Sequence, residues 1–288
     1  MRLRLLTDFR SHFPRNFFAP VLTRIALTDQ TSRCSTCVLG QICLPVGMNA
    51  DDVRKMDDLV TERIRIKKGQ ALYTLGEPLE AVYGIRFGTL KTHLTLEDGR
   101  HQITGFHLPG EIVGLDGIGE MRHVSDATAL EDTEVCVVRY AELQQLSRRL
   151  PSLQHQFLRI MSKEISQDHL MLLTLGSMRA EERLAAFLLN LSRRSSERGY
   201  SSTEFVLRMS REELGSYLGL KLETVSRLFS RFAEAGLIQI RQRHVKLIDM
   251  AGLRQGDDRP DPADRPAAAS AQMSGCSSAS SSPIPGDT

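Results

Sequence analysis

The chain has 288 residues, of which 41% are hydrophobic and 25% charged, and its formal net charge is +2. This length allows one large or two ordinary domains, and the near-neutral charge gives no global reason to expect nucleic-acid binding. No run of about 18 uncharged apolar residues occurs, and no small-residue cleavage site follows the N-terminal arginines. We therefore expect no membrane span and no secretory signal, and we expect a cytoplasmic protein.

Residues 1–30 show no clean hydrophobic period, and we expect a flexible arm there. Cysteines then crowd into a short stretch at Cys34, Cys37 and Cys43, and Cys136 lies far downstream. An odd cysteine count in a reducing compartment fits disulfides poorly and favours a metal or redox role. Because C-x2-C pairs occur in zinc sites and in ferredoxins, the spacing alone leaves an iron–sulfur cluster, a zinc ion and unligated thiols open.

Short, β-prone runs punctuated by glycine occupy residues 63–140. They are ERIRIKKGQALYTLGE, AVYGIRFGTLKTHLTLEDGR, HQITGFHLPGEIVG and ATALEDTEVCVVRY. Alternating apolar residues between glycine-containing turns predict paired antiparallel strands. Many short strands at this spacing predict a small barrel or jelly roll, which together with the cysteine stretch forms a domain over residues 31–145.

A single long helix is predicted over residues 150–176, because Pro151 suits its first turn and no glycine follows before Gly176. Apolar residues, Met161 and Ile165 among them, recur at spacings of three and four and predict a packing seam. We expect a second copy of the chain to cover the seam, giving a homodimer. The same spacing carries Asp168 onto or beside the stripe, where it would meet its own copy and weaken association, unless it is a solvated carboxylate off the seam.

A helix-turn-helix is predicted within a second domain over residues 178–251. Ser210 and Glu213 form an S-x-x-E capping box, Gly219 ends the first helix, and a second helix spans about 222–235. This second helix presents Glu223, Ser226, Arg227, Ser230 and Arg231 away from its apolar face. Arginine can bind guanine and glutamate can accept from cytosine, so the outward face can contact base edges in double-stranded DNA, with IQIRQRHVKLID as a wing at the phosphates.

The last segment, residues 252–288, is rich in Pro, Ala, Ser and Asp and has little to bury. We expect a disordered tail there, with Cys276 as a bystander.

The order of barrel, long helix and winged helix-turn-helix resembles the regulator family of the cyclic-AMP receptor protein. Within that family, LGLKLETVSRLFSRF, AEERLAAFLLNLSRR, GFHLPGEIVG and C-x-x-C-x-x-x-x-x-C together resemble the FNR branch of oxygen-responsive iron–sulfur regulators. The implied fold is α+β: an N-terminal antiparallel β-roll (a jelly roll like that of cyclic-nucleotide-binding domains), a long dimerisation helix and a C-terminal winged helix-turn-helix.

The resemblance also implies site residues and partners. Cys34, Cys37, Cys43 and Cys136 match the thiolate ligands of a 4Fe-4S cluster that is labile to oxygen. The match assigns Glu223, Ser226 and Arg227 to base reading at TTGAT-type half-sites of a two-fold operator. Asp168, beside Ile165 and Met161, matches the charged residue that disfavours the dimer when no cluster is bound. A homodimer that controls anaerobic genes as activator or repressor together with RNA polymerase is implied.

The sequence departs from the family pattern at two positions. Lys221 stands where relatives usually have threonine, which bears on the start of the recognition helix, and Val38 occupies a position that tunes how readily oxygen attacks the cluster. Where cyclic-nucleotide binders carry an Arg-Ser pair this chain has His123 and Val124, so we expect no bound cyclic nucleotide.

Rival functions fit the sequence less well. The runner-up is a regulator of the same fold that is gated by another small ligand or stabilised by zinc. We expect no enzyme, because no Ser-His-Asp pattern or phosphate-binding glycine loop is present.

Overall fold

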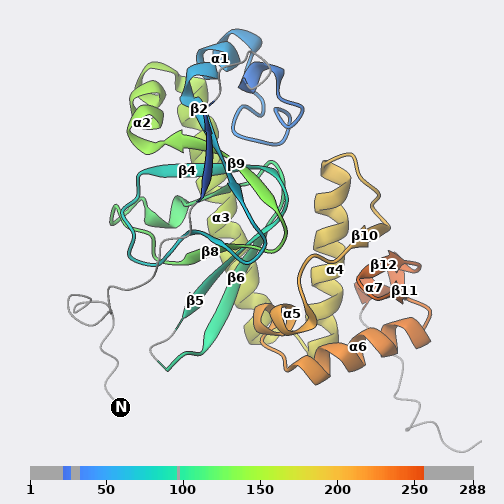
Figure 1. Ribbon diagram of the computed structural model, residues 1–288. Coiled ribbons are helices and arrows are strands. Elements are labelled where there is room, and N and C mark those ends of the chain that lie inside the picture. The colour runs from blue at the N-terminus through green and yellow to red at the C-terminus, as the bar shows by residue number, and fades with distance from the viewer. Residues whose placement is uncertain (1–21, 27–32, 96–97, 256–288) are drawn as a thin grey trace, which may run out of the picture. The chain divides into compact units, whose positions relative to one another are not determined.

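The computed structural model describes residues 22–26, 33–95 and 98–255, and its elements follow the predicted order of β-roll, long helix and winged helix-turn-helix (Figure 1). The α+β fold is confirmed. The strands are β1 (Thr23–Ala26), β2 (Val60–Ile66), β3 (Ala71–Tyr73), β4 (Ala81–Phe87), β5 (Leu90–Thr95), β6 (His101–His107), β7 (Ile112–Val113), β8 (Asp126–Ala129), β9 (Thr133–Arg139), β10 (Glu204–Val206), β11 (Ile238–Arg241) and β12 (His244–Leu247). The α-helices are α1 (Ala50–Lys55), α2 (Tyr140–Arg149), α3 (Pro151–Ser177), α4 (Ala180–Glu197), α5 (Arg211–Leu218), α6 (Leu222–Glu234) and α7 (Met250–Gln255).

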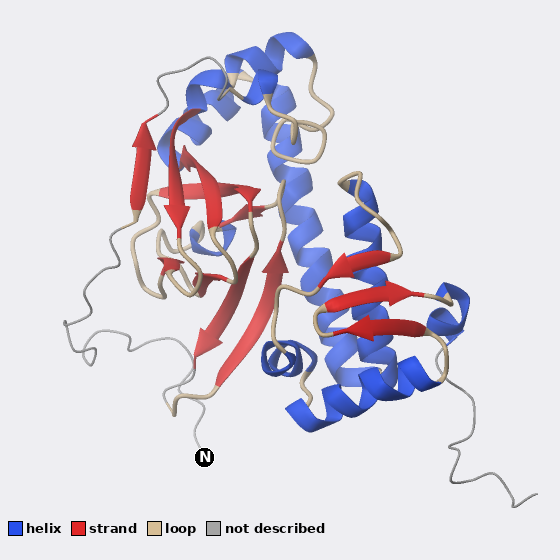
Figure 2. Ribbon diagram, turned by 45° about the vertical axis from the view of Figure 1, so that its right-hand side comes forward, coloured by secondary structure: helices blue, strands red, loops and turns tan. Residues whose placement is uncertain are grey.

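The β-roll consists of two antiparallel sheets with strand orders β1-β2-β9-β4-β7 and β3-β8-β5-β6, visible in red in Figure 2. Their facing side chains form one apolar core that includes Ile64, Ile85, Leu90 and Val135, each at most 2% exposed. β-branched residues that alternate with polar ones favour such half-buried strands. Gly88 turns the chain between β4 and β5 at a φ of +87°, and a β-carbon there would lie 2.3 Å from the Thr133 hydroxyl, so only glycine fits.

Helix α3 starts at Pro151, whose fixed φ and missing N–H suit the first helical position. One face of its first turns is buried, with Leu153 at 0% exposure, whereas its later turns expose large apolar side chains. The helix therefore runs alongside the β-roll at one end and leads into α4 at the other (Figure 1).

The C-terminal domain is a winged helix-turn-helix. The Ser210 hydroxyl accepts from the Glu213 amide at 3.1 Å while the Glu213 carboxylate accepts from the Ser210 amide at 2.7 Å, which confirms the capping box. Gly219 ends α5 in the left-handed region, as predicted, and α6 follows after two residues. The predicted wing is the hairpin of β11 and β12, to which β10 adds a third antiparallel strand.

Three segments differ from the sequence-based expectations. The expected flexible arm contains β1, which pairs with β2 and adds an Arg24–Glu62 ion pair of 3.2 Å. The polar residues 199–205 before the helix-turn-helix, where no strand is predicted, run into β10, because half-buried Phe205 packs on the domain core. Helix α7 continues to Gln255, past the expected start of the tail, because Leu253 is buried.

The rest of the expected arm (residues 1–21 and 27–30) and of the expected tail (256–288, with Cys276) lies outside the described residues. Among the helices that the structure describes, none is long and apolar enough to cross a membrane.

Candidate functional site

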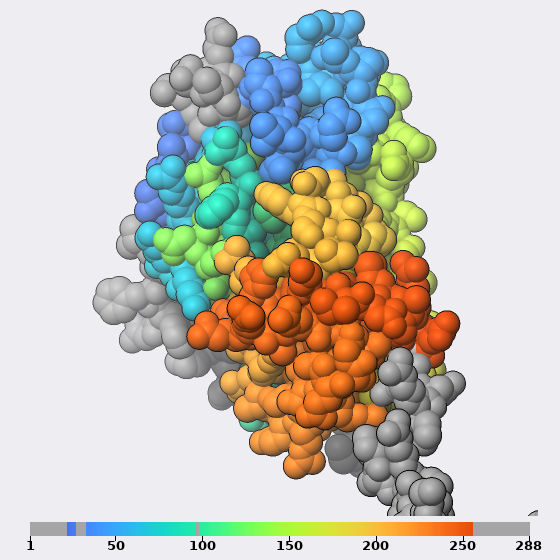
Figure 3. All heavy atoms as spheres, turned by 90° about the vertical axis from the view of Figure 1, so that its right-hand side faces the viewer, coloured from blue at the N-terminus to red at the C-terminus, as the bar shows by residue number. Residues whose placement is uncertain are grey.

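The cysteine loop, residues 33–47, is a series of tight turns at the surface of the molecule, drawn in blue in Figure 3. Cys34 opens a short 3-10 helix, and the Gly40 and Cys43 amides donate to the carbonyls of Cys37 and Leu39 at 3.0 and 2.9 Å. These local hydrogen bonds make the loop compact, so that the three cysteines it carries lie close to one another.

A carboxylate anchors the start of this loop. Asp57, in the 3-10 turn Asp57–Leu59 before β2, accepts from the Ser35 amide at 2.9 Å and from the Ser35 hydroxyl at 2.6 Å. The anchor fixes the position of the loop next to Cys34.

Cys136 comes to the same place from the β-roll. It lies in β9, opposite Gly84 of β4 and Arg63 of β2. A β-carbon added to Gly84 would lie 3.6 Å from Cys43 Sγ and 3.9 Å from Cys136 Cβ, so Gly84 adjoins both cysteines and brings the loop next to β9.

The four predicted ligands are free thiols that influence one another. The pKa of Cys34 is raised to about 12, first by burial and then by the neighbouring Cys43, Cys136 and Cys37 thiols. Burial also raises the pKa of Cys43 to about 12. Thiols in such surroundings are protonated at neutral pH, so a metal group would have to displace their protons to bind.

Arg63 supplies positive charge beside Cys136. Burial raises the pKa of the Cys136 thiol, while the adjacent Arg63 guanidinium and its hydrogen bond lower it. No three His, Cys, Asp or Glu side chains in residues 22–26, 33–95 and 98–255 are arranged to hold a single metal ion. Val38, the predicted tuning position, is 92% exposed beside Cys37.

One apolar cluster connects the cysteine loop with the start of α3. Leu44, 4% exposed, belongs to the same cluster as Ile112 and Leu153. The partly buried residues packed against this cluster include Cys34, Cys43, Cys136, Phe157, Ile160 and Met161. The cysteine loop and the first turns of α3 therefore share one packed core.

The predicted base-reading residues share one exposed face of α6. Glu223, Ser226 and Arg227 are exposed, whereas Val225 and Phe229 are buried against the domain core. The helix-turn-helix, in orange, lies at the surface in Figure 3. This geometry leaves the N-terminal half of α6 free to enter a DNA groove.

Two further basic residues of α6 have different surroundings. Lys221 is the N-cap of α6 in an extended conformation and makes no side-chain capping bond, so the helix starts normally without the usual cap. Arg231 does not point only to solvent, since its Nη1 lies 2.8 Å from the Glu181 carboxylate of α4.

Residues 182–255 match the family model of the Crp-like helix-turn-helix domain, and residues 63–149 match that of the cyclic nucleotide-binding domain. The chain is 63% identical to the transcriptional regulatory protein btr of Bordetella pertussis over 232 residues, which cover 81% of this chain and 96% of that protein. The chain belongs to the CRP/FNR family. It is 44% identical to the anaerobic regulatory protein of Haemophilus influenzae over 220 residues, or 76% of this chain and 86% of that one. The solved structure of FixK2 from Bradyrhizobium japonicum is 32% identical, has a TM-score of 0.63, and aligns with 67% of this chain and 95% of its own.

This CRP/FNR chain is a DNA-binding transcriptional regulator, as the sequence predicted, and its family comprises regulators and not enzymes.

The long helix of this CRP/FNR regulator carries an exposed apolar stripe. Leu158, Ile165 and Leu172 are 60%, 53% and 69% exposed and are spaced by seven residues, as on a coiled-coil seam. A heptad seam has two positions, three residues apart. Met161 follows Leu158 by three residues and Asp168 follows Ile165 by three, so both occupy the second seam position. In this register Asp168 falls at a seam position and is exposed, and whether it meets a second copy there stays a prediction.

A carboxylate occupies the site where the sequence of this CRP/FNR chain lacks the arginine of cyclic-nucleotide binders. Asp116 accepts from the Val124 amide at 3.1 Å, from the Ser125 amide at 3.0 Å and from the Ser125 hydroxyl at 2.7 Å. His123 lies 3.3 Å from the same carboxylate and stacks on Tyr73 at 3.7 Å between ring centroids. The Asp116 carboxylate is thus the anion to which the two amides and the hydroxyl donate.

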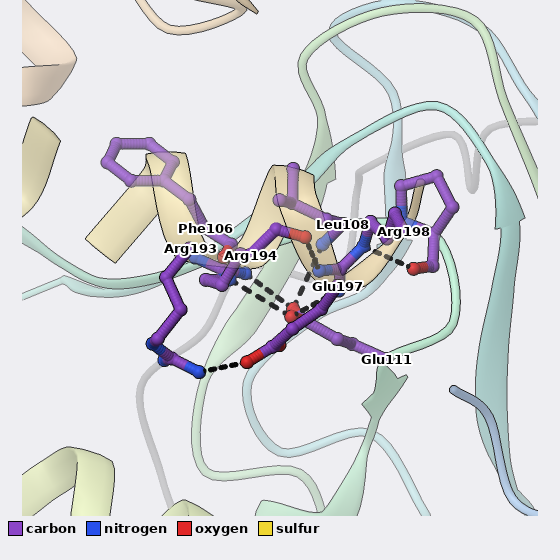
Figure 4. Close-up of polar contacts among 8 residues, drawn as sticks. Phe106, Leu108, Glu111, Arg193, Arg194, Glu197 and Arg198 are labelled. Atoms are coloured by element: carbon purple, nitrogen blue, oxygen red, sulfur yellow. Dashed lines mark hydrogen bonds and ion pairs between the residues drawn. The ribbon is translucent and has the colours of Figure 1, made fainter. Parts of the chain in front are cut away.

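The sequence did not predict the contacts that several residues make in the structure. Leu44 stands in a loop and Asp116 in a glycine-rich turn, and nothing in their spacing shows what they contact. Glu111 pairs with Arg194 of α4 and with Arg198, which follows α4 (Figure 4). The arginines at the end of this amphipathic helix were visible in the sequence, but the sequence does not identify Glu111 as their partner.

Proposed function

We propose that this protein regulates anaerobic gene expression and that a 4Fe-4S cluster on Cys34, Cys37, Cys43 and Cys136 controls its dimerisation and operator binding. The observation that carries the proposal is the apolar cluster that Cys34, Cys43 and Cys136 share with the first turns of α3. The name of the relative from Haemophilus influenzae adds the anaerobic context.

The donor set fits an iron–sulfur group better than a zinc ion. Zinc ribbons take their four thiolates from paired C-x2-C units, whereas here five residues separate Cys37 from Cys43 and Cys136 stands alone on β9. A four-iron cluster takes one thiolate on each iron, so three thiols from one loop and a fourth from a strand can hold it. The positive charge of Arg63 beside Cys136 favours thiolate ligands.

When bound, the cluster supplies an oxygen-sensitive connection between the four thiolates. The chain's own residues do the rest: Cys34, Cys37 and Cys43 hold the loop against Cys136 of β9, and Leu44 then stays packed near Leu153 of α3. Cluster binding favours the dimer only if the conformation that dimerises binds the cluster more tightly than the conformation that does not. A difference of about 3 kcal/mol in cluster-binding free energy between the two conformations changes the association constant of the dimer more than a hundredfold.

Asp168 provides the opposing contribution. In a parallel homodimer each Asp168 meets its copy on the stripe of Ile165, and like charges in a partly dry interface repel. Glu164 lies beside the stripe, and its pKa is raised to about 7, first by burial and then by the negative charges of Glu111 and Asp168, so it is only partly charged at neutral pH. Dimerisation is therefore weak without the packing that ligation provides.

DNA recognition requires the dimer, because one helix-turn-helix reads only a half-site. Glu223, Ser226 and Arg227 from each protomer read the two TTGAT-type half-sites of a two-fold operator. The regulator then acts on RNA polymerase in the cytoplasm, as activator or repressor.

Cyclic nucleotides are not part of this function. The backbone amides and hydroxyl that could bind a cyclic phosphate already bind Asp116, and a phosphate beside that carboxylate would meet like charge. A regulator of this fold that is gated by another small ligand is the alternative.

Iron, sulfide and zinc analysis of protein purified without air tests the proposal. The expected result is about four iron and four sulfide per chain and binding to a TTGAT palindrome that is lost in air. A probe with the guanines exchanged is the specificity control. Colourless protein with one zinc per chain and air-stable operator binding would support the zinc-stabilised alternative instead.

A further inference from the structure

The β-roll and the helix-turn-helix of one protomer are joined by a buried ion-pair network, drawn in Figure 4. Glu111, in the turn between β6 and β7, receives Arg194 of α4 on both carboxylate oxygens, at 3.0 Å from Nε and 2.6 Å from Nη2. Arg198, which follows the last turn of α4, donates to the same carboxylate at 2.6 Å. We call these three residues the interdomain network.

The network is well shielded from water. The side chains of Arg194, Arg198 and Glu111 are 14%, 6% and 15% exposed. Burial alone would raise the pKa of Glu111, but the two guanidinium groups outweigh it and lower this pKa to about 2. The carboxylate is thus charged throughout the physiological range, and loss of one partner would leave buried charge uncompensated.

The arginines also bind the backbone of the β-roll. Arg194 donates to the Phe106 carbonyl at 2.6 Å and Arg198 to the Pro109 carbonyl at 2.7 Å. The Leu108 amide donates to Glu111 at 3.0 Å. The turn of residues 108–111 is therefore held in the geometry that receives α4.

The same turn contacts the cysteine loop. A β-carbon on Gly110 would lie 2.7 Å from the side chain of Ile42, which stands between Cys37 and Cys43. Ile42 therefore packs directly on the backbone next to Glu111. The turn has the cysteine loop on one side and α4 on the other.

Contacts further along the same boundary set the position of α5. Lys91 Nζ lies 2.8 Å from the Glu213 carboxylate, the Ile103 amide donates to the Ser216 hydroxyl at 3.1 Å, and the Phe106 and Tyr217 rings are 5.0 Å apart. Glu223, Ser226 and Arg227 of α6 are exposed and take no part in these contacts. The boundary therefore positions the recognition helix without covering it.

We propose that Glu111 is a positioning residue for operator recognition: through Arg194 and Arg198 it fixes the DNA-binding domain on its own β-roll, and the turn of residues 108–111 links that domain to the cysteine loop. In a two-fold complex the two recognition helices must match the spacing of the half-sites, so a loosened domain loses the benefit of the second half-site. The expected effect on operator affinity rests on the proposed two-fold operator, whereas the contact between the β-roll and the DNA-binding domain does not.

The test compares Glu111→Gln with Glu197→Gln. Glu197 makes an ion pair with Arg193 on the same helix, but both side chains are about half exposed, so this variant removes the same charge outside the network. Two measurements are made: affinity for the full operator relative to a single half-site, and hydrogen exchange in residues 101–107 and 211–218.

For Glu111→Gln we expect the ratio of operator to half-site affinity to fall at least about tenfold, with half-site affinity within about twofold, and exchange in both segments to rise at least about tenfold. Glu197→Gln should change neither. Unchanged exchange, or an equal loss of operator and half-site affinity, would overturn the inference. If the unsubstituted protein did not prefer the full operator, the two-fold proposal would fail, and the exchange data would still decide the role of Glu111 in fixing the domain.

Discussion

Leu44 offers a direct way to separate cluster binding from its effect on dimerisation. It is 4% exposed and belongs to the apolar cluster that joins the cysteine loop to α3, yet it is no proposed ligand. Leu44→Ala therefore leaves the four thiols in place and removes part of the packing between the loop and the helix.

Truncation of a buried leucine costs about 2–5 kcal/mol. If this packing carries the coupling, even about 2 kcal/mol lowers the association constant of the cluster-loaded protein about thirtyfold. The assay is sedimentation velocity without air over a concentration series, with iron determined on the same samples so that dimerisation is compared per loaded chain.

Leu72→Ala is the matched control, because Leu72 is 5% exposed in the other core cluster of the β-roll, away from the cysteines and α3. It should lower the unfolding temperature similarly and leave dimerisation unchanged. The coupling account is refuted if iron-loaded Leu44→Ala dimerises like the unsubstituted protein, or if Leu72→Ala weakens the dimer equally.

Two further results are expected. Asp168→Ala should raise the association constant of cluster-free protein at least about tenfold, because the like-charge contact on the stripe is gone. The variant should therefore retain operator binding in air. An unchanged oxygen dependence in an operator-binding assay would remove Asp168 from the mechanism. Cyclic AMP should produce no binding heat in calorimetry, because Asp116 already satisfies the available donors; saturable binding would contradict that reasoning.

Local signals explain what the sequence could predict. The capping box at Ser210, the turn at Gly219 and Pro151 at the start of α3 each depend on neighbours within a few residues, and the structure has all of them. Binary patterning likewise predicted the paired strands and the exposed face of α6. β10 was missed because its three residues are too few for a period.

Long-range partners could not be predicted in this way. Glu111 and Arg194 are 83 positions apart, and neither residue's neighbourhood identifies the other. The grouping of Cys136 with the cysteine loop came from family resemblance, since spacing alone left zinc and free thiols open. Asp116 was missed because an internal carboxylate that replaces a ligand has no sequence signature beyond a polar residue in a turn.

The central claim, that the cysteine site controls DNA binding, is tested most directly by titrating the anaerobically purified protein with oxygen while recording visible absorbance and operator binding on the same samples. The account predicts that absorbance and binding decline together, in proportion, and that single Cys→Ser changes at Cys34 or Cys136 abolish both. Operator binding that persists after the absorbance has gone would contradict it.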